Sequence, residues 1–136
     1  MANEPLVPAL YAGFGCRRGC PVDTLDTLLR TTLTHHGLPL RALRGIASLT
    51  LKADEPGLLQ LAERLDLPLI LFDSFSVAPF EAWLSHRSHA AFAQTGCWGV
   101  AESTALALAQ RMQPHPTLRV TRQVLGAATL ALASGG

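Results

Sequence analysis

Short, mostly apolar segments recur along the chain at intervals that suit the strands of a covered sheet. They lie at residues 6–12, 45–51, 69–72, 118–122 and 127–133. Residues 69–72 read Leu-Ile-Leu-Phe, and a wholly apolar run of this length is typical of a strand that is covered on both faces. The last two segments flank a turn around Gln123–Gly126, which predicts a terminal hairpin.

Amphipathic stretches separate the apolar segments, and they have the periodicity of helices. Apolar residues recur every three or four positions over residues 21–36, and Gly37 suits the position just past the end of that helix. A second helix is predicted over residues 54–65 with Asp54 as its N-cap, and a third over the alanine-rich residues 101–112.

The resulting order, β-α-β-α-β-(α)-α-β-β, predicts an α/β fold of three layers. We expect a mainly parallel sheet with helices on both faces and a C-terminal antiparallel hairpin at its edge. At 136 residues the chain, residues 1–136, is expected to be a single domain. Ligands bind beyond the carboxyl ends of parallel strands. This rule places residues 13–19, 52–55 and 73–74 on one rim of the sheet.

Composition narrows the class of protein. Hydrophobic residues make up 49% of the chain and charged residues 15%, which favours a compact core over a disordered chain. A net charge of +1 argues against general nucleic-acid binding. No signal peptide or membrane-length apolar segment is seen, so we expect a cytoplasmic protein without a membrane partner. Three cysteines, an odd number, argue against a disulfide framework.

The charges are distributed unevenly along the chain. Residues 13–52 carry six basic and two acidic side chains, residues 53–85 carry one basic and six acidic ones, and residues 86–136 carry four basic and one acidic. The two basic segments could therefore meet around an anionic small molecule. A scattered distribution over the surface is the equally weighted alternative.

Residues 13–19, Gly-Phe-Gly-Cys-Arg-Arg-Gly, are expected to form a strand-to-helix turn. Glycine allows a sharp turn and a close approach of the backbone to a ligand, and the next helix presents free N–H groups at its N-terminus. With the guanidinium groups of Arg17 and Arg18, this loop could bind a carboxylate or a phosphate. A glycine-rich connection with two solvated arginines explains the same residues.

Other chemistries fit less well. The glycine spacing is G-x-G-x3-G, one residue longer than the dinucleotide fingerprint, and no Gly-Lys-Ser/Thr of a P-loop follows. Cys16-x3-Cys20 lacks the spacing of a zinc knuckle, and His86 and His89 are expected to face solvent beside Arg87. The neighbouring arginines would stabilise a Cys16 thiolate, which makes Cys16 a candidate nucleophile, although an inert buried cysteine is the favoured interpretation.

Glu102 is the lone acidic residue among residues 86–136, near the start of the alanine-rich helix. Its carboxylate could interact favourably with the helix dipole, which would stabilise the helix by about 0.3–1 kcal/mol. It could instead orient Arg17 or Lys52, or act as a general base. The spacing alone favours the helix-dipole interpretation.

Several segments resemble a known family. Residues 13–19 are similar to the G-x-G-C-R-R-G signature of the family formed by the cobalamin-biosynthesis protein CobE and the C-terminal domain of CbiG. Residues 52–59 and 99–105 match the second and third blocks of that family, in the same order. Residues 118–133 resemble its closing strands, with Arg122 where a lysine is usual.

The resemblance implies a part in making the corrin ring of cobalamin. Full-length CbiG is credited with hydrolytic opening of a lactone on a cobalt-precorrin with loss of acetaldehyde, whereas CobE belongs to the oxygen-dependent pathway. Because the length resembles CobE, the expected function is to bind a precorrin or corrinoid intermediate as a carrier or accessory protein of the oxygen-dependent pathway. The alternative is a precorrin-lactone hydrolase with Glu102 or Cys16 as base or nucleophile. A subunit that docks on another enzyme of the pathway is a third interpretation.

The predicted ligand is a precorrin or a hydrogenobyrinic-acid-like tetrapyrrole, with no cofactor and no metal ion. Its carboxylates would pair with an Arg/Lys-rich rim, and Phe14, Phe75 or Trp98 could cover the apolar ring, unless they are core residues. The predicted ligand-binding residues are Gly13, Gly15, Cys16, Arg17, Arg18, Gly19, Lys52, Asp54, Glu55, Glu102 and Arg122.

Overall fold

The computed structural model describes residues 8–85, 87–96 and 98–135. Strands and helices alternate through the first half of the chain, three helices follow, and two strands close it. The elements are β1 (Leu10–Cys16), α1 (Val22–His35), β2 (Leu43–Leu49), α2 (Pro56–Leu65), β3 (Leu69–Phe72), α3 (Ser74–Val77), α4 (His89–Thr95), α5 (Val100–Met112), β4 (Thr117–Leu125) and β5 (Ala128–Ser134). Short 3₁₀ segments lie at Leu40–Ala42, Thr50–Lys52 and Ala78–Trp83.

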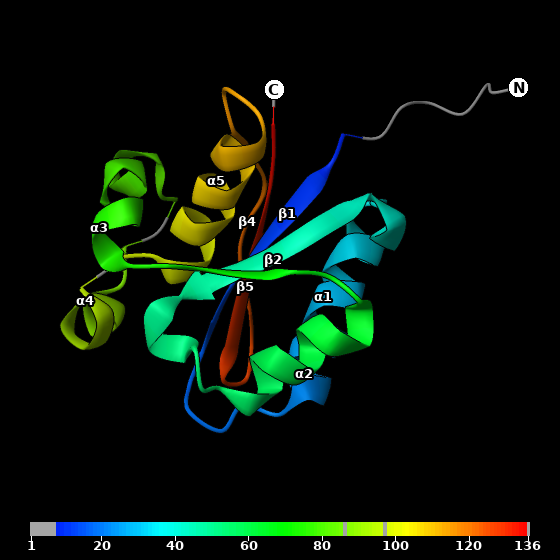
Figure 1. The fold of residues 1–136 in the computed structure, drawn as a ribbon, viewed down its shortest axis with the longest axis horizontal. Coiled ribbons are helices and arrows are strands. Elements are labelled where there is room, and N and C mark those ends of the chain that lie inside the picture. The colour runs from blue at the N-terminus through cyan, green and yellow to red at the C-terminus, as the bar shows by residue number, and fades with distance from the viewer. Residues whose placement is uncertain (1–7, 86, 97, 136) are drawn as a thin grey trace, which may run out of the picture.

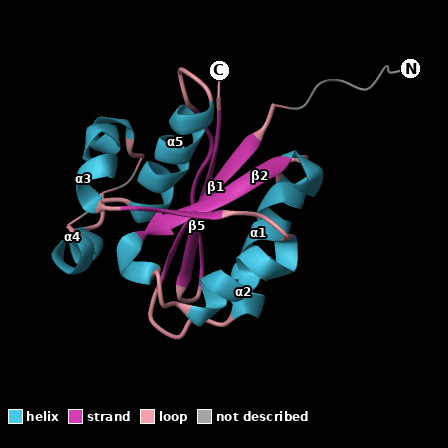
Figure 2. Ribbon diagram, in the orientation of Figure 1, coloured by secondary structure: helices cyan, strands magenta, loops and turns pink. Residues whose placement is uncertain are grey.

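The five strands form one sheet in the order β3-β2-β1-β5-β4. β1 pairs with β2 and β2 with β3 in parallel, whereas β5 runs antiparallel to β1 and β4 antiparallel to β5. In Figures 1 and 2 the sheet runs through the middle of the molecule, with α1 and α2 on one side and α3, α4 and α5 on the other. The predicted α/β fold with a C-terminal antiparallel hairpin is therefore confirmed.

Two apolar cores lie on opposite faces of the sheet. Leu25 and Leu29 of α1 pack with Phe14 and Leu130 on one face. On the other face, alanines of α5 pack against Tyr11 and against alanines of β5. Small side chains on both surfaces bring α5 close to the sheet, so this helix lies almost in contact with the backbone of β1.

The first strand begins later than its hydrophobic pattern indicated. The predicted segment was residues 6–12, of which 6 and 7 lie outside the described residues, and β1 instead spans Leu10–Cys16. Gly13 and Gly15 are therefore strand residues and do not belong to the turn. Tertiary packing overrides the low strand propensity of glycine here, because a side chain at Gly13 would collide with α5.

Two further predictions need correction. β3 was expected to be covered on both faces, yet it is an edge strand whose four residues are all partly exposed. The N-cap of α2 is Glu55 and not Asp54, with Pro56 in the first helical position. Glu55 caps no N–H of its own helix, because its carboxylate is bonded to the loop after β1.

Helix α5 matches its predicted span to within one residue, but its environment differs from that of a surface helix. Residues 101–109 are all buried. The sheet covers one side of α5, and α3 with the 3₁₀ segment Ala78–Trp83 packs on another. Phe80 of this 3₁₀ segment is buried against the α5 core.

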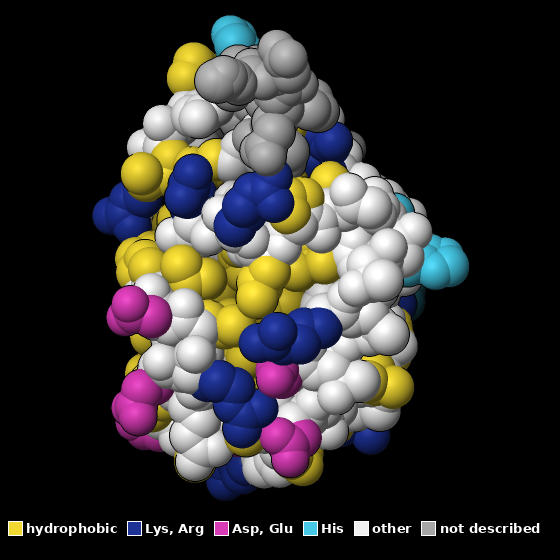
Figure 3. Space-filling view, turned by 90° about the vertical axis from the view of Figure 1, so that its right-hand side faces the viewer, with side chains coloured by type: hydrophobic (Ala, Val, Ile, Leu, Met, Phe, Trp, Pro, Cys, Tyr) yellow, Lys and Arg dark blue, Asp and Glu magenta, His cyan; other side chains and the backbone are white. Residues whose placement is uncertain are grey.

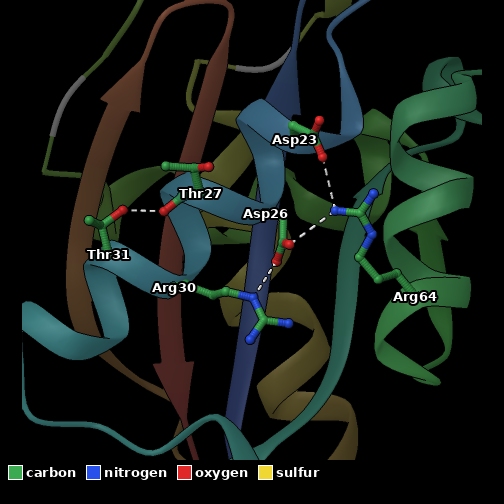
Figure 4. Close-up of polar contacts among 6 residues, drawn as sticks. All are labelled: Asp23, Asp26, Thr27, Arg30, Thr31 and Arg64. Carbon is green, nitrogen blue, oxygen red and sulfur yellow. Dashed lines mark hydrogen bonds and ion pairs between the residues drawn. The ribbon is translucent and has the colours of Figure 1, made fainter.

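Helices α1 and α2 are also joined by ion pairs (Figure 4). Nη1 of Arg64, on α2, lies 3.1 Å from Oδ1 of Asp23 and 3.1 Å from Oδ2 of Asp26, both on α1. Within α1, Nε of Arg30 lies 2.7 Å from Oδ1 of Asp26. The carboxylates of Asp23 and Asp26 raise the pKa of Arg64 through hydrogen bonds from its guanidinium group.

Figure 3 shows the face that carries α1 and α2, where apolar side chains gather at the centre with charged ones around them. None of the helices in the described ranges is long and apolar enough to cross a membrane.

Candidate functional site

A pocket of about 640 Å³ opens at the carboxyl ends of β1 and β2. Its walls come from the end of β1, the 3₁₀ segment after β2, the β4–β5 hairpin, α4 and the first turn of α5. In Figure 1 these elements meet at the lower left of the molecule. The position agrees with the general rule for ligand sites in parallel sheets.

The three glycines of residues 13–19 have different structural roles. A Cβ atom at Gly13 would lie 2.0 Å from the carbonyl oxygen of Ala101, and one at Gly15 would lie 2.6 Å from Oγ1 of Thr129. Gly19 has a φ of +80° with open space around it. Gly13 therefore permits close packing of α5, and Gly19 permits the turn. Of the three, Gly15 alone lines the pocket.

The two neighbouring arginines separate in space. The backbone N–H of Arg17 donates to the carbonyl of Ala127 at 2.9 Å, which fixes the loop to the β4–β5 hairpin, and Arg17 lines the pocket. Arg18 is exposed and lies outside the pocket lining. The pocket lining thus includes one arginine of the pair and not the other, so the structure does not bring both arginines into one anion site.

The predicted segment 52–55 is divided in the same way. Lys52 lines the pocket, whereas Asp54 is exposed outside it. Glu55 is buried, and its Oε2 accepts a hydrogen bond from the backbone N–H of Gly19 at 2.9 Å. Glu55 thus holds the loop after β1 in place and does not line the pocket.

Glu102 is buried on the first turn of α5, with 2% of its surface exposed. Its carboxylate accepts the backbone N–H of Ser85 at 2.7 Å and that of Arg122 at 2.8 Å, and it also accepts the hydroxyl of Ser85. Neither Arg17 nor Lys52 forms an ion pair with Glu102 in the described part of the chain. Its bonding partners are thus different from those that the sequence suggested.

The opposite wall of the pocket was not predicted from the sequence. Arg87 lines it, and one Nη of Arg87 donates to the carbonyl of Glu81 at 3.3 Å. Arg87 and His89 are exposed, as expected for this polar segment, whereas His86 lies outside the described residues. Trp98 lines the same wall and stacks on Phe92 with a centroid distance of 4.3 Å. Of the other aromatic candidates, Phe14 is a core residue and Phe75 is 88% exposed outside the pocket.

Comparison with known proteins identifies the family of the chain. Residues 10–133 match the sequence profile of the family described as "Cobalamin synthesis G C-terminus", which covers nearly all of the chain. The chain belongs to this family. It is thus a cobalamin-biosynthesis protein of the group that CobE and the C-terminal part of CbiG define, as the residue blocks indicated.

Individual relatives of the family share different parts of the chain. Protein CobE from Sinorhizobium sp is 36% identical over 124 residues, which cover 91% of this chain and 79% of that protein. A solved structure of CobE, described as a protein from the cobalamin (vitamin B12) biosynthetic pathway, superposes with a TM-score of 0.89 at 40% identity, covering 96% of this chain and 93% of that chain. Cobalt-precorrin-5A hydrolase from Salmonella typhimurium is 44% identical over 77 residues, which cover 56% of this chain but 22% of that protein.

The residue blocks that carry the family resemblance meet in the pocket. Cys16 and Arg17 come from the first block, Lys52 from the second and Glu102 from the third, and Arg122 joins them from β4. The predicted residues that lie outside the lining are Gly13, Arg18, Gly19, Asp54 and Glu55. Among the described residues, no group of three or more His, Cys, Asp or Glu side chains could hold a metal ion.

The environment of Cys16 does not stabilise a thiolate. Burial raises the pKa of the Cys16 thiol to about 11; the positive charge of Lys52 opposes this, and Glu55 and Cys20 add to it. The arginine-rich sequence had indicated the reverse direction. Cys16 is a thiol at neutral pH, which removes the basis for its prediction as a nucleophile.

We therefore expect slow alkylation of Cys16 in the folded protein. With a pKa about two units above that of an ordinary cysteine, its thiolate fraction at pH 7.4 should be roughly 100-fold lower. Its rate of reaction with iodoacetamide should rise about tenfold per pH unit up to pH 10. Peptide mass spectrometry measures this rate. The urea-unfolded protein serves as the control, and equal rates in the folded and unfolded states at pH 7.4 would contradict the prediction.

Proposed function

We propose that the protein binds a polycarboxylate tetrapyrrole of the precorrin or hydrogenobyrinic-acid type and acts as a carrier or accessory protein in corrin-ring synthesis. The observation that supports this most is the charge of the pocket. Four cationic side chains line it: Arg17, Lys52, Arg87 and Arg122. Glu102 is the single acid among the described residues that line it, and that carboxylate is occupied by hydrogen bonds from Ser85 and Arg122.

The cations of the pocket are available to an anionic ligand. Within the described ranges, neither Arg17, Lys52 nor Arg122 forms an ion pair with a carboxylate. A carboxylate paired with a guanidinium forms a short, charge-assisted hydrogen bond, and Arg can bind it with two parallel donors. Cations on several walls suit a ligand that carries carboxylates around its edge.

The remaining surface of the pocket suits an apolar ring. Trp98, Val100 and Val124 line it together with Leu49. An aromatic side chain next to aliphatic ones provides the kind of surface that covers a flat macrocycle. The pocket is also open to solvent beside the exposed Arg122, which is compatible with transfer of the ligand to an enzyme of the same pathway.

A hydrolase is less well supported than a binding protein. The relatives from Salmonella typhimurium and Priestia megaterium are named cobalt-precorrin-5A hydrolases, but the alignments cover 22% and 32% of their lengths. The two catalytic candidates of this chain are poorly placed for that reaction. The Glu102 carboxylate is engaged by backbone donors, and the Cys16 thiol has a raised pKa.

A titration with hydrogenobyrinic acid, followed by its visible absorbance, tests the proposal. We expect a saturable change with the wild-type protein and a dissociation constant raised about 10- to 150-fold by Arg17→Ala, the equivalent of losing one charged hydrogen bond of 1.5–3 kcal/mol. Arg18→Ala is the matched control, because it removes the same charge from the adjacent residue outside the pocket.

The proposal fails if the wild-type protein causes no spectral change at micromolar concentration. It also fails if Arg17→Ala and Arg18→Ala bind equally to the wild type. Turnover of the ligand during the titration would instead favour the hydrolase. A cell that expresses the pathway offers an independent test, since a coloured tetrapyrrole should co-purify with the wild-type protein and not with Arg17→Ala.

A further inference from the structure

The strand that carries Arg122 is irregular at that residue. Val120 of β4 pairs with Leu132 of β5, and Gln123 pairs with Leu130. Two residues of β4, Thr121 and Arg122, therefore stand opposite a single residue of β5. This extra residue is a β-bulge, a feature that bends a strand and changes the direction of a side chain.

The Glu102 carboxylate binds the backbone at this bulge. The N–H of Arg122 donates to Oε2 of Glu102 at 2.8 Å. Glu102 is on the first turn of α5, and it is 2% exposed. A buried carboxylate thus binds the backbone of one of the two bulge residues, and the side chain of that residue lines the pocket.

The same carboxylate also holds the start of the opposite wall. Oε1 of Glu102 accepts the backbone N–H of Ser85 at 2.7 Å, and its other oxygen accepts the Ser85 hydroxyl. Two residues further along the chain, Arg87 lines the pocket. The backbone N–H of Ser88 donates to the carbonyl of Trp98 at 2.8 Å, which joins the chain before α4 to the chain after it.

Helix α4 depends on these attachments because it has little packing of its own. None of its residues is buried, and its packing on the other helices and strands is slight. Ser85 lies shortly before this helix, and the Ser88–Trp98 bond joins the residues that flank it on its two sides. The position of the wall is therefore set by its ends, and one of these ends is bound to Glu102.

We propose that Glu102 is a positioning residue, which aims Arg122 and the Arg87 wall at one ligand by binding the β4 bulge and Ser85 together. The proposal rests on the function proposed above, because it assigns these two cations to the same polycarboxylate. A carboxylate suits this role because it accepts hydrogen bonds at both oxygens and donates none. Glutamine at the same place would present an NH₂ group to one of the two segments.

Hydrogen exchange measured by NMR tests the attachment without any ligand. In Glu102→Gln, we expect the amide exchange rates of Arg122 and Ser85 to rise at least about tenfold together, because one donor loses its acceptor and both segments loosen. The amide of Ala12, on the central strand β1, should keep its rate. Unchanged exchange at both Arg122 and Ser85 would overturn the proposal.

A double-mutant cycle with hydrogenobyrinic acid then tests the effect on binding. Arg122→Ala should raise the dissociation constant about tenfold in the wild-type background and less than about threefold in Glu102→Gln, because Arg122 is no longer aimed at the ligand. Arg17→Ala should raise the dissociation constant by the same factor in both backgrounds. A general loss of stability in Glu102→Gln would instead change the effects of Arg17→Ala and Arg122→Ala alike.

Each failure has its own meaning. If Arg122→Ala costs the same in both backgrounds, Glu102 does not position Arg122 and this inference is wrong. If the wild type does not bind the tetrapyrrole, the proposed function fails, and the exchange rates alone decide whether Glu102 joins the two segments. Should Glu102→Gln not fold, Ser85→Ala replaces it: it removes the hydroxyl bond, and the cost of Arg87→Ala should be smaller in that background than in the wild type.

Discussion

A Gly13→Ala variant is expected to lose at least about 3 kcal/mol of folding free energy, at the upper end of the cost of overpacking a core. A Cβ atom at this position would lie 2.0 Å from the carbonyl oxygen of Ala101 and 2.6 Å from the backbone nitrogen of Ala105. Because both atoms belong to the backbone of α5, no side-chain rotation can relieve the contact. The whole helix would have to move away from β1.

Such a movement would be costly because α5 is packed on four strands. It contacts β1, β2, β4 and β5, and its residues 101–109 are all buried. For a domain of this size, the loss should lower the melting temperature by about 10 °C or more. Thermal unfolding followed by circular dichroism measures this shift, and urea unfolding gives the free energy.

Gly37→Ala is the control for a glycine that has a different role. Gly37 has a φ of +65° at the end of α1, and nothing lies within 4 Å of a Cβ atom there. Its replacement should cost about 1–2 kcal/mol, the strain of alanine in the left-handed region. If Gly13→Ala were as mild as Gly37→Ala, the close contact between β1 and α5 would not be present.

The difference between Gly13 and Gly37 shows what the sequence could and could not predict. Gly37 follows a helix with regular leucine spacing, so local rules alone assign its role. The role of Gly13 depends on Ala101 and Ala105, which are about ninety residues away in the chain. Nothing in the local pattern indicates such a contact, and the glycines were accordingly placed in a loop and not in a strand.

The sequence likewise predicted the position of the candidate site but not every side chain that lines it. The strand-end rule correctly placed Arg17 and Lys52 near each other, because it depends only on strand order and direction. It could not decide which way side chains point in a tight turn. The loop turns here, with a positive φ at Gly19 and a bond from the N–H of Cys20 to the carbonyl of Arg17, and Arg17 lines the pocket whereas Arg18 does not.

The distribution of charge along the chain was the more informative signal. Arg17 and Lys52 come from the first basic segment, and Arg87 and Arg122 from the last. The acidic middle segment, residues 53–85, contributes no residue to the pocket lining. Of the two interpretations of the charge distribution, the structure shows the one in which the two basic segments meet. Charge counts alone could not identify Arg87, since its place on the pocket wall depends on the course of the chain around α4.

Removing Arg17 and Lys52 together is expected to weaken tetrapyrrole binding by at least about 100-fold. Each of these cations can form a charge-assisted hydrogen bond to a ligand carboxylate, and one such bond contributes about 1.5–3 kcal/mol. Arg17 directly follows β1 and Lys52 ends the 3₁₀ segment after β2, so both are placed where paired strands of the sheet end. Their loss should therefore not be compensated by movement of the backbone.

The control for Arg17→Ala/Lys52→Ala is Arg18→Ala/Arg44→Ala. It removes the same two charges, but Arg18 is exposed outside the pocket and Arg44 lies near the start of β2, at the opposite end of the strand. Titrations with hydrogenobyrinic acid at several salt concentrations measure both pairs. The wild-type affinity should fall as salt screens the charges, and the Arg17/Lys52 pair should show a shallower dependence. If the two pairs lose affinity equally, the ligand is attracted by the net charge of the protein and is not bound in the pocket.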